Sequence, residues 1–277
     1  MLKIGFLGPK GTFSQEALFE YKKGEKDFVE CAYNTFGEII NAVDKDEIDE
    51  GIVPIENSLE GAVSATLDTL ATDVDLLIKA EIAIEVKQNL LVRKGTNIEN
   101  IKYILSHPQP IGQCRNYLET NFNHAEIRFI YSTAEAAREV AKCDFNMAAI
   151  GSITAAKVYG LDVIAEGIQD SKNNYTRFVV VSKTAAKKAK NNKTSIVFST
   201  EDKPGSLYRV LDIFNLWDIN MTRIESRPAK DKLGNYIFFV DIKGHIEDDD
   251  VRDALTMVKR KTSFYKFLGS YPEFIIQ

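Results

Sequence analysis

The strongest constraint on the fold is that strand and helix patterns alternate along residues 2–182. Short apolar runs at 2–7, 51–55 and 179–181 are typical of buried strands. Between such runs lie segments with apolar residues at helical spacing, as at 111–122. Alternating strands and helices favour a largely parallel sheet with helices on its faces. In such sheets ligands bind beyond the carboxyl ends of the strands, so the loops at these ends are candidate sites.

Length and composition indicate an ordinary globular protein with more than one folding unit. The chain has 277 residues, of which 44% are hydrophobic and 27% charged, and its net charge is −5. This length suits two or three units, and the acidic balance argues against a nucleic-acid partner. The sequence shows neither a secretory leader pattern nor an apolar run that could span a bilayer. We therefore expect a cytoplasmic protein without nucleic-acid or membrane partners.

The cysteines and histidines lack the spacing of a metal or redox site. Cys31, Cys114 and Cys143 are far apart and are expected to be reduced thiols. The three histidines form neither an HxxxH nor an HExxH arrangement. The sequence therefore predicts no bound metal.

A compact polar segment, Asn-Asn-Tyr-Thr-Arg-Phe at 173–178, comes directly before the apolar run 179–181. It places amides, a phenol, a hydroxyl and a cation at the mouth of a buried strand, where a rigid scaffold would fix them. This arrangement suits chemistry on a small anion. A surface turn before a strand explains the same residues without any function.

Three further loops are expected to present backbone N–H groups at helix starts, where an anion can bind. They are the segments 8–14, 56–61 and 106–113. The first lacks both the P-loop ending and a GxGxxG pattern, so a plain turn is an alternative. Asn57 and Ser106 could equally be helix caps.

Residues 183–193 are predicted to be a linker, because they are rich in Ala and Lys and have no periodic apolar face. A nucleic-acid patch is the less favoured interpretation, since no aromatic residues lie between the lysines. Residues 194–277 then read as βαββαβ, the split βαβ sandwich. Such a small sheet leaves its edges uncovered, so self-association to a dimer or tetramer is expected.

Five motifs, in order along the chain, carry a resemblance to a known family. They are Gly8-Pro9-x-Gly11-Thr12-Phe13-Ser14, Pro54-Ile55-Glu56-Asn57-Ser58-x-x-Gly61, Ser106-His107-Pro108-Gln109-x-x-x-Gln113-Cys114, Asn174-x-Thr176-Arg177-Phe178, and Gly205-x-Leu207 with Ile224-Glu225-Ser226-Arg227-Pro228. Together they resemble the prephenate dehydratases of the single-function type with a C-terminal ACT domain. The resemblance covers essentially the whole chain, and because no mutase-like helical region precedes Leu2, the fused bifunctional form is not expected.

The resemblance implies an α/β catalytic region at 1–182 that is two-lobed and periplasmic-binding-protein-like (type II). Its first lobe would comprise about 1–76 plus 160–182 and its second about 80–158, with the substrate between them. The linker at 183–193 would lead to a ferredoxin-like βαββαβ ACT regulatory domain at 194–277.

The resemblance also implies a reaction and an effector. Prephenate would lose carbon dioxide and water to give phenylpyruvate in L-phenylalanine biosynthesis, without a cofactor, and phenylalanine would bind the ACT domain and regulate the rate. Two alternatives are arogenate dehydratase and a non-catalytic two-lobed sensor of a small anion.

Residue roles follow from matching positions. The implied catalytic residues are Thr176, Arg177, Asn57, Ser106, Gln113 and Glu56. Further substrate contacts are expected from Gly11, Thr12, Ser58 and Phe178. The implied phenylalanine site comprises Gly205, Ser206, Leu207, Asn220, Glu225, Ser226, Arg227 and Pro228, although Ser206 stands where family members often carry Ala. His107 is expected to be a turn residue rather than a base.

The chemistry fits these residues. Prephenate is a dianion, so we expect helix N-termini and Arg177 to bind it. Its ring hydroxyl is a poor leaving group, and a hydroxyl donor such as Thr176 would act on it as a general acid, an effect worth about 10²- to 10⁴-fold. Because threonine is a feeble acid, Arg177 is expected to assist from close by.

Overall fold

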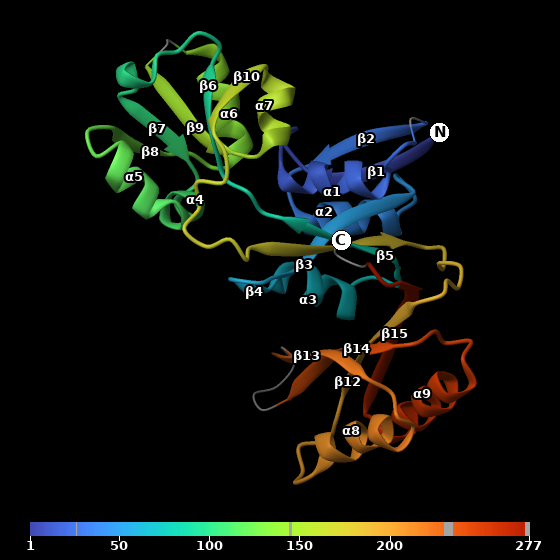
Figure 1. Ribbon diagram of the computed structural model, residues 1–277. Helices are drawn as coiled ribbons and strands as arrows, with labels where there is room; N and C mark the ends of the chain where they lie inside the picture. Colours follow the sequence, from blue (N-terminus) through green and yellow to red (C-terminus); the bar gives the residue numbers. More distant parts are fainter. Residues whose placement is uncertain (26, 144–145, 230–234, 275–277) are drawn as a thin grey trace.

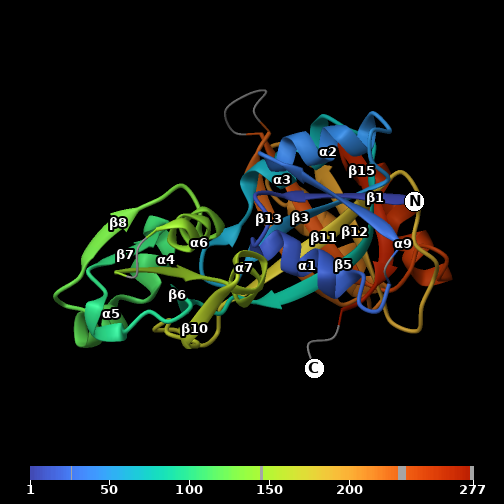
Figure 2. The same cartoon turned by 90° about the horizontal axis from the view of Figure 1, so that it is seen from above.

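The computed structural model describes residues 1–25, 27–143, 146–229 and 235–274. These residues form two α/β lobes and a third, smaller α/β domain that lies under the first lobe (Figure 1). Seen from above, the second lobe extends to one side while the first lobe and the third domain overlap (Figure 2). None of the helices within the described ranges is long and apolar enough to cross a membrane.

Lobe one is built on a six-stranded mixed sheet. In spatial order its strands are β2 (Phe28–Tyr33), β1 (Leu2–Leu7), β3 (Glu50–Asn57), β11 (Tyr175–Ser182) and β5 (Leu77–Glu85), with the short β4 (Gly61–Ala62) paired to β3. Its helices are α1 (Phe13–Tyr21), α2 (Phe36–Asp44) and α3 (Ser64–Thr72). Strand β11 enters this sheet after the chain has passed through lobe two, and it runs antiparallel to both neighbours. A strand in this central place is covered on both faces, which is why 179–181 is apolar throughout.

Lobe two is a five-stranded sheet with helices around it. In spatial order its strands are β10 (Leu161–Ala165), β6 (Asn89–Arg93), β9 (Met147–Gly151), β7 (Tyr103–Ser106) and β8 (Glu126–Phe129). Its helices are η1 (Ile98–Asn100), α4 (Pro108–Gln113), α5 (Arg115–Asn121), α6 (Thr133–Lys142) and α7 (Ile153–Tyr159). Two chain crossings, from β5 to β6 and from β10 to β11, join the lobes, and this architecture confirms the expected two-lobed α/β fold.

The lobe boundaries differ from those expected at both crossings. Strand β5 pairs with β11, so residues 77–85 belong to lobe one, and β10 pairs with β6, so residues 161–165 belong to lobe two. The alternating pattern around 81–87 suggested a half-exposed crossover. In the structure its polar residue Glu81 is only 5% exposed, because the third domain covers that face of β5.

The third domain has the predicted βαββαβ order. Its elements are β12 (Asn192–Ser199), α8 (Ser206–Leu216), β13 (Met221–Pro228), β14 (Tyr236–Lys243), α9 (Asp249–Lys261) and β15 (Phe264–Pro272). The sheet order is β13-β14-β12-β15, and α8 and α9 pack together on one face of it. Strand β13 is an edge strand, with β14 as its described partner.

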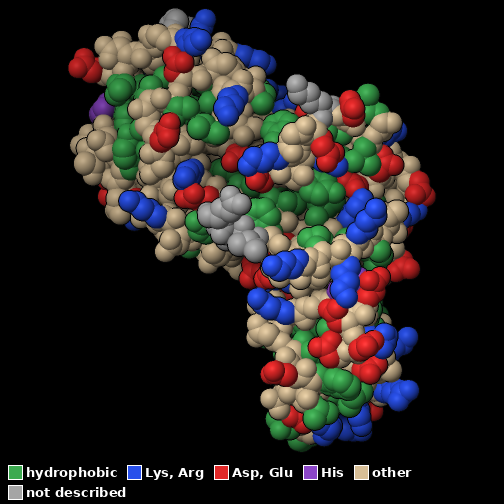
Figure 3. Space-filling view, turned by 45° about the vertical axis from the view of Figure 1, so that its right-hand side comes forward, with side chains coloured by type: hydrophobic (Ala, Val, Ile, Leu, Met, Phe, Trp, Pro, Cys, Tyr) green, Lys and Arg blue, Asp and Glu red, His purple; other side chains and the backbone are tan. Residues whose placement is uncertain are grey.

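The other face of this sheet packs on lobe one. Val179 and Val181 of β11 share a core with Val197, Phe239 and Tyr271 of the third domain. Around this shared core, charged side chains of both signs are interspersed over the narrow junction (Figure 3). The third domain is therefore joined to lobe one by a buried interface as well as by the linker.

Gly269 of β15 packs against the backbone of Ile78 in β5, and its replacement by Ala should destabilise this interface. Its φ is +131°, and a Cβ added there would lie 2.5 Å from the carbonyl oxygen of Ile78. We expect Gly269→Ala to cost about 2 kcal/mol or more. Gly37→Ala is the matched control, because that Cβ would meet no described atom within 4 Å. Thermal unfolding checks both variants, and equal melting temperatures would contradict the prediction.

Candidate active site

A cleft of about 440 Å³ lies between the two lobes. The loops that follow β1, β3 and β7 all reach it, as the rule for strand carboxyl ends predicts. Its polar lining consists of Thr12, Ser14, Asn57, Glu60, Gln88, His107, Gln109, Gln113, Ser132, Thr133, Asn174 and Thr176. Phe13, Phe36 and Phe178 contribute an apolar, aromatic wall on the side of lobe one.

Asn57 and Thr176 form the best-defined pair in this cleft. They lie opposite each other on β3 and β11, and Asn57 Nδ2 donates to Thr176 Oγ1 at 2.8 Å. Asn57 Oδ1 accepts from the backbone N–H groups of Leu59 and Glu60 at 2.9 and 3.0 Å, which fixes the orientation of the amide. Because the threonine oxygen accepts from Asn57, its own proton is left to donate elsewhere. The pair therefore presents a hydroxyl proton in the cleft.

Three amide side chains join the lobes behind this pair. Asn174 and Gln88 lie on the two crossings and are each 2% exposed, and Gln113 lies at the end of α4. Gln88 Nε2 and Asn174 Nδ2 both lie within 3.5 Å of Gln113 Oε1, at 3.4 and 3.5 Å. Asn174 Oδ1 in turn accepts from Asn57 at 2.9 Å. These amides connect both crossings to the Asn57–Thr176 pair.

The starts of three helices, α1, α6 and α4, lie at the cleft. Thr12 caps α1, accepting from Gln15 N–H, and Ser132 caps α6, accepting from Glu135 N–H. The first N–H groups of a helix have no partner within the helix, so they and the helix dipole attract an anion. His107 caps α4 in the same way, as its expected role in a turn implied.

Comparisons with known proteins decide the family. The prephenate dehydratase family model matches residues 4–186, and the ACT domain model matches residues 194–256. The chain belongs to the prephenate dehydratase family. The resemblance carried by the five sequence motifs is thereby confirmed.

Relatives match along almost the whole chain. A prephenate dehydratase of Methanocaldococcus jannaschii is 41% identical over 96% of both chains. A bifunctional chorismate mutase/prephenate dehydratase of Aquifex aeolicus is 40% identical over 100% of this chain and 75% of its own length. The crystal structure of a prephenate dehydratase from Arthrobacter aurescens, in complex with L-Phe, is 36% identical, with a TM-score of 0.89 over 98% of this chain and 90% of that one.

The family's expected site is only partly assembled in the cleft. Thr176, Asn57, Gln113, Thr12 and Phe178 line it. Sequence reasoning missed Gln88, which stands outside every motif and gives no signal in the spacing. It also passed over Asn174, although that residue belongs to the motif around Thr176.

Arg177 and Glu56 do not face the cleft, and the interpretation of Arg177 as its cation is wrong. Successive residues of a strand point to opposite faces, so Arg177 points away from Thr176. Its side chain forms ion pairs with Asp241 of the third domain, at 2.6 Å, and with Glu81, at 3.2 Å. Among the cleft-lining residues within the described ranges there is no Lys or Arg.

Three other expected site residues also lie outside the cleft lining. Ser106 is fully buried, and its hydroxyl donates to the carbonyl of Ile150 at 2.9 Å, which holds β7 against β9. Gly11 has a φ of +92° and packs against Ala155 of lobe two, where a Cβ would lie 3.0 Å away. Ser58 Oγ donates to the Asn173 carbonyl at 2.8 Å and so ties the loop after β3 to the start of β11.

The expected phenylalanine residues fall into separate groups. Gly205, Ser206 and Leu207 line a hollow of about 360 Å³ at one end of the third domain's sheet. Glu225 to Pro228 lie on β13, and Arg227 forms an ion pair with Asp68 of α3 at 2.8 Å. Residues 225–228 are not among those that line the hollow at Gly205.

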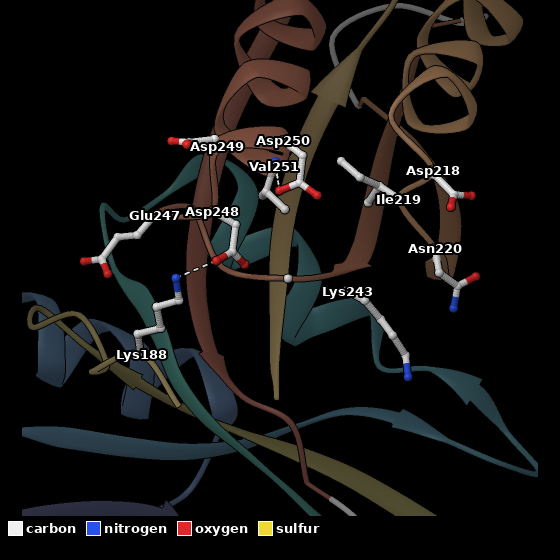
Figure 4. Close-up of a pocket in the computed structure, with 11 residues that line it drawn as sticks. Lys188, Asp218, Ile219, Asn220, Lys243, Glu247, Asp248, Asp249, Asp250 and Val251 are labelled. Atoms are coloured by element: carbon white, nitrogen blue, oxygen red, sulfur yellow. Dashed lines mark hydrogen bonds and ion pairs between the residues drawn. The ribbon is translucent and has the colours of Figure 1, made fainter. Parts of the chain in front are cut away.

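Asn220 lies at the opposite end of that sheet. It lines a different hollow, of about 680 Å³, beside Asp218 and Lys243, with Lys188 and Asp248 paired across it (Figure 4). At about 3.3 Å per strand residue, Asn220 is about 25 Å from Pro228. Pro228 pairs with Tyr236, which lines the hollow at Gly205. Within one chain, Asn220 therefore cannot share a site with Gly205, and the single-site expectation needs this correction.

Proposed function

We propose that this cytoplasmic protein converts prephenate to phenylpyruvate, carbon dioxide and water. The observation that carries the proposal is the Asn57–Thr176 hydrogen bond, which leaves a hydroxyl proton directed into a cleft between lobes. Family membership gives the reaction class, and the cleft supplies what that class needs: a proton donor, anion-binding helix starts and an apolar wall.

The reaction follows from these parts. The bond between the ring and its carboxylate breaks, and its electron pair moves into the ring. The bond between the ring and its hydroxyl breaks as the Thr176 proton is transferred to the departing oxygen, giving water. A proton taken up from solvent then restores the Thr176 hydroxyl, so each turnover consumes one proton. Phe13, Phe36 and Phe178 surround the ring as it becomes aromatic, and the helix starts at Thr12 and Ser132 hold the carboxylates.

The direct test is to incubate the purified chain with prephenate and follow phenylpyruvate and carbon dioxide together. We expect equal amounts of both products. A parallel assay with arogenate measures the preference between the two substrates as a ratio of kcat/KM. Binding of prephenate without release of carbon dioxide would contradict the proposed activity and favour a sensor.

L-Phenylalanine is the expected effector. The Arthrobacter relative was crystallised with L-Phe, and Gly205 at the start of α8 leaves its backbone open to a carboxylate. A ligand that binds only the folded state stabilises it by about 2.7 kcal/mol at 100 times its Kd. We therefore expect L-phenylalanine, but not D-phenylalanine, to raise the melting temperature and to change the rate. An unchanged melting temperature and rate at high concentration would contradict this role.

Self-association of the third domain would complete the effector site. Strand β13 is a sheet edge, and the neighbouring surface carries exposed Tyr208, Leu216, Ile224 and Tyr236. An uncovered edge beside apolar side chains is suited to a second copy of the same domain. Such a pairing would also bring residues such as Gly205 and Asn220 together from different chains. Light scattering is expected to give a mass of twice or four times 31.1 kDa, and a monomer would contradict it.

A further inference from the structure

Two neighbouring residue pairs on β3 and β11 face opposite sides of the same sheet. Thr176 pairs with Asn57 in the cleft, and Arg177 pairs with Glu56 on the side of the third domain. The members of the two pairs are consecutive in sequence, so they share backbone. A shift of Arg177 or Glu56 therefore moves Thr176 or Asn57, whose hydrogen bond is 2.8 Å long.

A buried cluster of charges surrounds Arg177 at the domain junction. Arg177 Nη2 lies 2.6 Å from Asp241 Oδ2, Arg177 Nη1 lies 3.2 Å from Glu81 Oε2, and Lys193 Nζ lies 2.8 Å from Glu81 Oε1. The side chains of Arg177, Glu81 and Asp241 are 16%, 2% and 3% exposed. Burial by itself raises the pKa of Asp241, but Arg177 and Arg223 outweigh it and hold that pKa below its ordinary value. The carboxylate of the third domain is therefore charged and bound to the back of the catalytic strand.

Glu56 is the least firmly held member of this cluster. It is 43% exposed, and both Arg177 Nε and Arg223 Nε approach the same oxygen, Oε2, at 3.4 Å. Arg223 comes from β13 of the third domain, and its buried Nη1 and Nη2 atoms have no hydrogen-bond partner among the described residues. A buried N–H donor without an acceptor costs free energy, so the Arg223 guanidinium favours any displacement that brings an acceptor to these atoms. Glu56 is therefore contacted by one arginine from each domain.

We propose that Arg177 and Glu56 are positioning residues for Thr176 and Asn57, and that Asp241 and Arg223 couple this positioning to the third domain. The proposal rests on the proposed dehydratase activity. Ordered binding of Arg177 by Asp241 and Glu81 keeps β11 in register with β3, so the threonine proton stays directed into the cleft. A rotation of the third domain changes the two arginine contacts to Glu56 and so shifts Asn57.

A second ion pair between the third domain and lobe one provides a control. It distinguishes an effect on the position of Thr176 and Asn57 from a general weakening of the contact between the domains. Arg227 of β13 binds Asp68 of α3 at 2.8 Å, and these side chains are 17% and 21% exposed. This contact also joins the third domain to lobe one, but α3 carries none of the residues that line the cleft. Asp68→Asn is therefore the matched control for Asp241→Asn.

The test compares the steady-state kinetics of Asp241→Asn and Asp68→Asn, each measured well below its own melting temperature. We expect Asp241→Asn to lower kcat about 10-fold or more with KM changed less than about threefold, since a displacement of about 1 Å at a reacting group can cost about 10²-fold. Asp68→Asn should retain kcat within about twofold. L-Phenylalanine should still raise the melting temperature of Asp241→Asn, yet no longer change its kcat.

Glu56→Gln provides the second route, because it removes the negative charge that Arg177 and Arg223 both approach while keeping the size of the side chain. Glu56→Gln should lower kcat in the same way as Asp241→Asn. The double variant should be no slower than the slower single variant, because both changes disrupt the same coupling between the third domain and the Asn57–Thr176 pair. Three results would overturn the proposal. They are an unchanged kcat in both Glu56→Gln and Asp241→Asn, an equal loss of kcat in Asp241→Asn and Asp68→Asn, and additive losses of kcat in the double variant. If the unmodified chain leaves prephenate intact, the proposed activity fails instead, and the two failures are thereby distinct.

Discussion

Replacement of Thr176 by Val should lower kcat by about 10²-fold or more and leave KM for prephenate within a few-fold. Valine keeps the branched shape in the cleft but removes the one hydroxyl that Asn57 orients. The loss should fall on kcat because the proton is needed when the ring hydroxyl leaves, not when the substrate binds. Initial rates of phenylpyruvate formation over a range of prephenate concentrations measure both constants.

Thr176→Ser is the matched control for this variant. It retains a hydroxyl that can accept from Asn57 and donate to the substrate, so most of the activity should remain. Both variants should melt within a few degrees of the unmodified protein, because Thr176 lies at the start of β11 and outside the shared core. Near-normal turnover by Thr176→Val would remove this hydroxyl from the mechanism.

The direction in which Arg177 points can be predicted from the alternation of side chains along a strand. The sequence predicts that Thr176 lies in the cleft, directly before a strand at 179–181. Side chains of a strand alternate between faces, so two consecutive residues at its mouth cannot both point into one cleft. The alternation that identified the buried strand also predicts that Arg177 faces away from Thr176.

Other parts of the site depend on contacts that no local pattern reveals. The order of strands and helices and the loops around the cleft could be predicted, because periodicity and caps are local. Glu81 could not be recognised as buried, since its cover comes from a domain more than a hundred residues away in sequence. Ser106 is the last residue of β7 and belongs to a family motif, yet its hydroxyl donates to the Ile150 carbonyl in a neighbouring strand. Only the sheet order determines that partner.

The position of Arg177 outside the cleft changes how the substrate is held. The cleft lining, within the described ranges, has no Lys or Arg, so we expect neutral N–H and amide donors to bind the dianion. A cation at the ring carboxylate would stabilise the ground state more than the transition state, in which the charge of that group moves into the ring. Binding that is stronger in the ground state slows the chemical step. Neutral donors avoid this cost at the carboxylate that is lost.

Asn57→Asp should reduce kcat/KM by about 10³-fold, with kcat lowered about 10²-fold or more. The carboxylate can still accept from the N–H groups of Leu59 and Glu60, so the turn after β3 is retained. It cannot donate to Thr176 Oγ1, so the threonine proton turns towards the carboxylate and away from the substrate. The added negative charge also opposes binding of a dianion and should raise KM.

Gln109→Glu separates these two effects, because Gln109 lines the same cleft without contacting Thr176. It should raise KM while kcat stays within about threefold. Acidification provides a second readout, because a protonated carboxyl at position 57 can again donate to Thr176. The activity of the Asn57→Asp variant, relative to that of the unmodified protein, should therefore rise as the pH falls towards the ordinary aspartate pKa of about 4. If Asn57→Asp behaves like Gln109→Glu, with KM alone affected, Asn57 serves the charge balance of the cleft and does not direct the threonine proton.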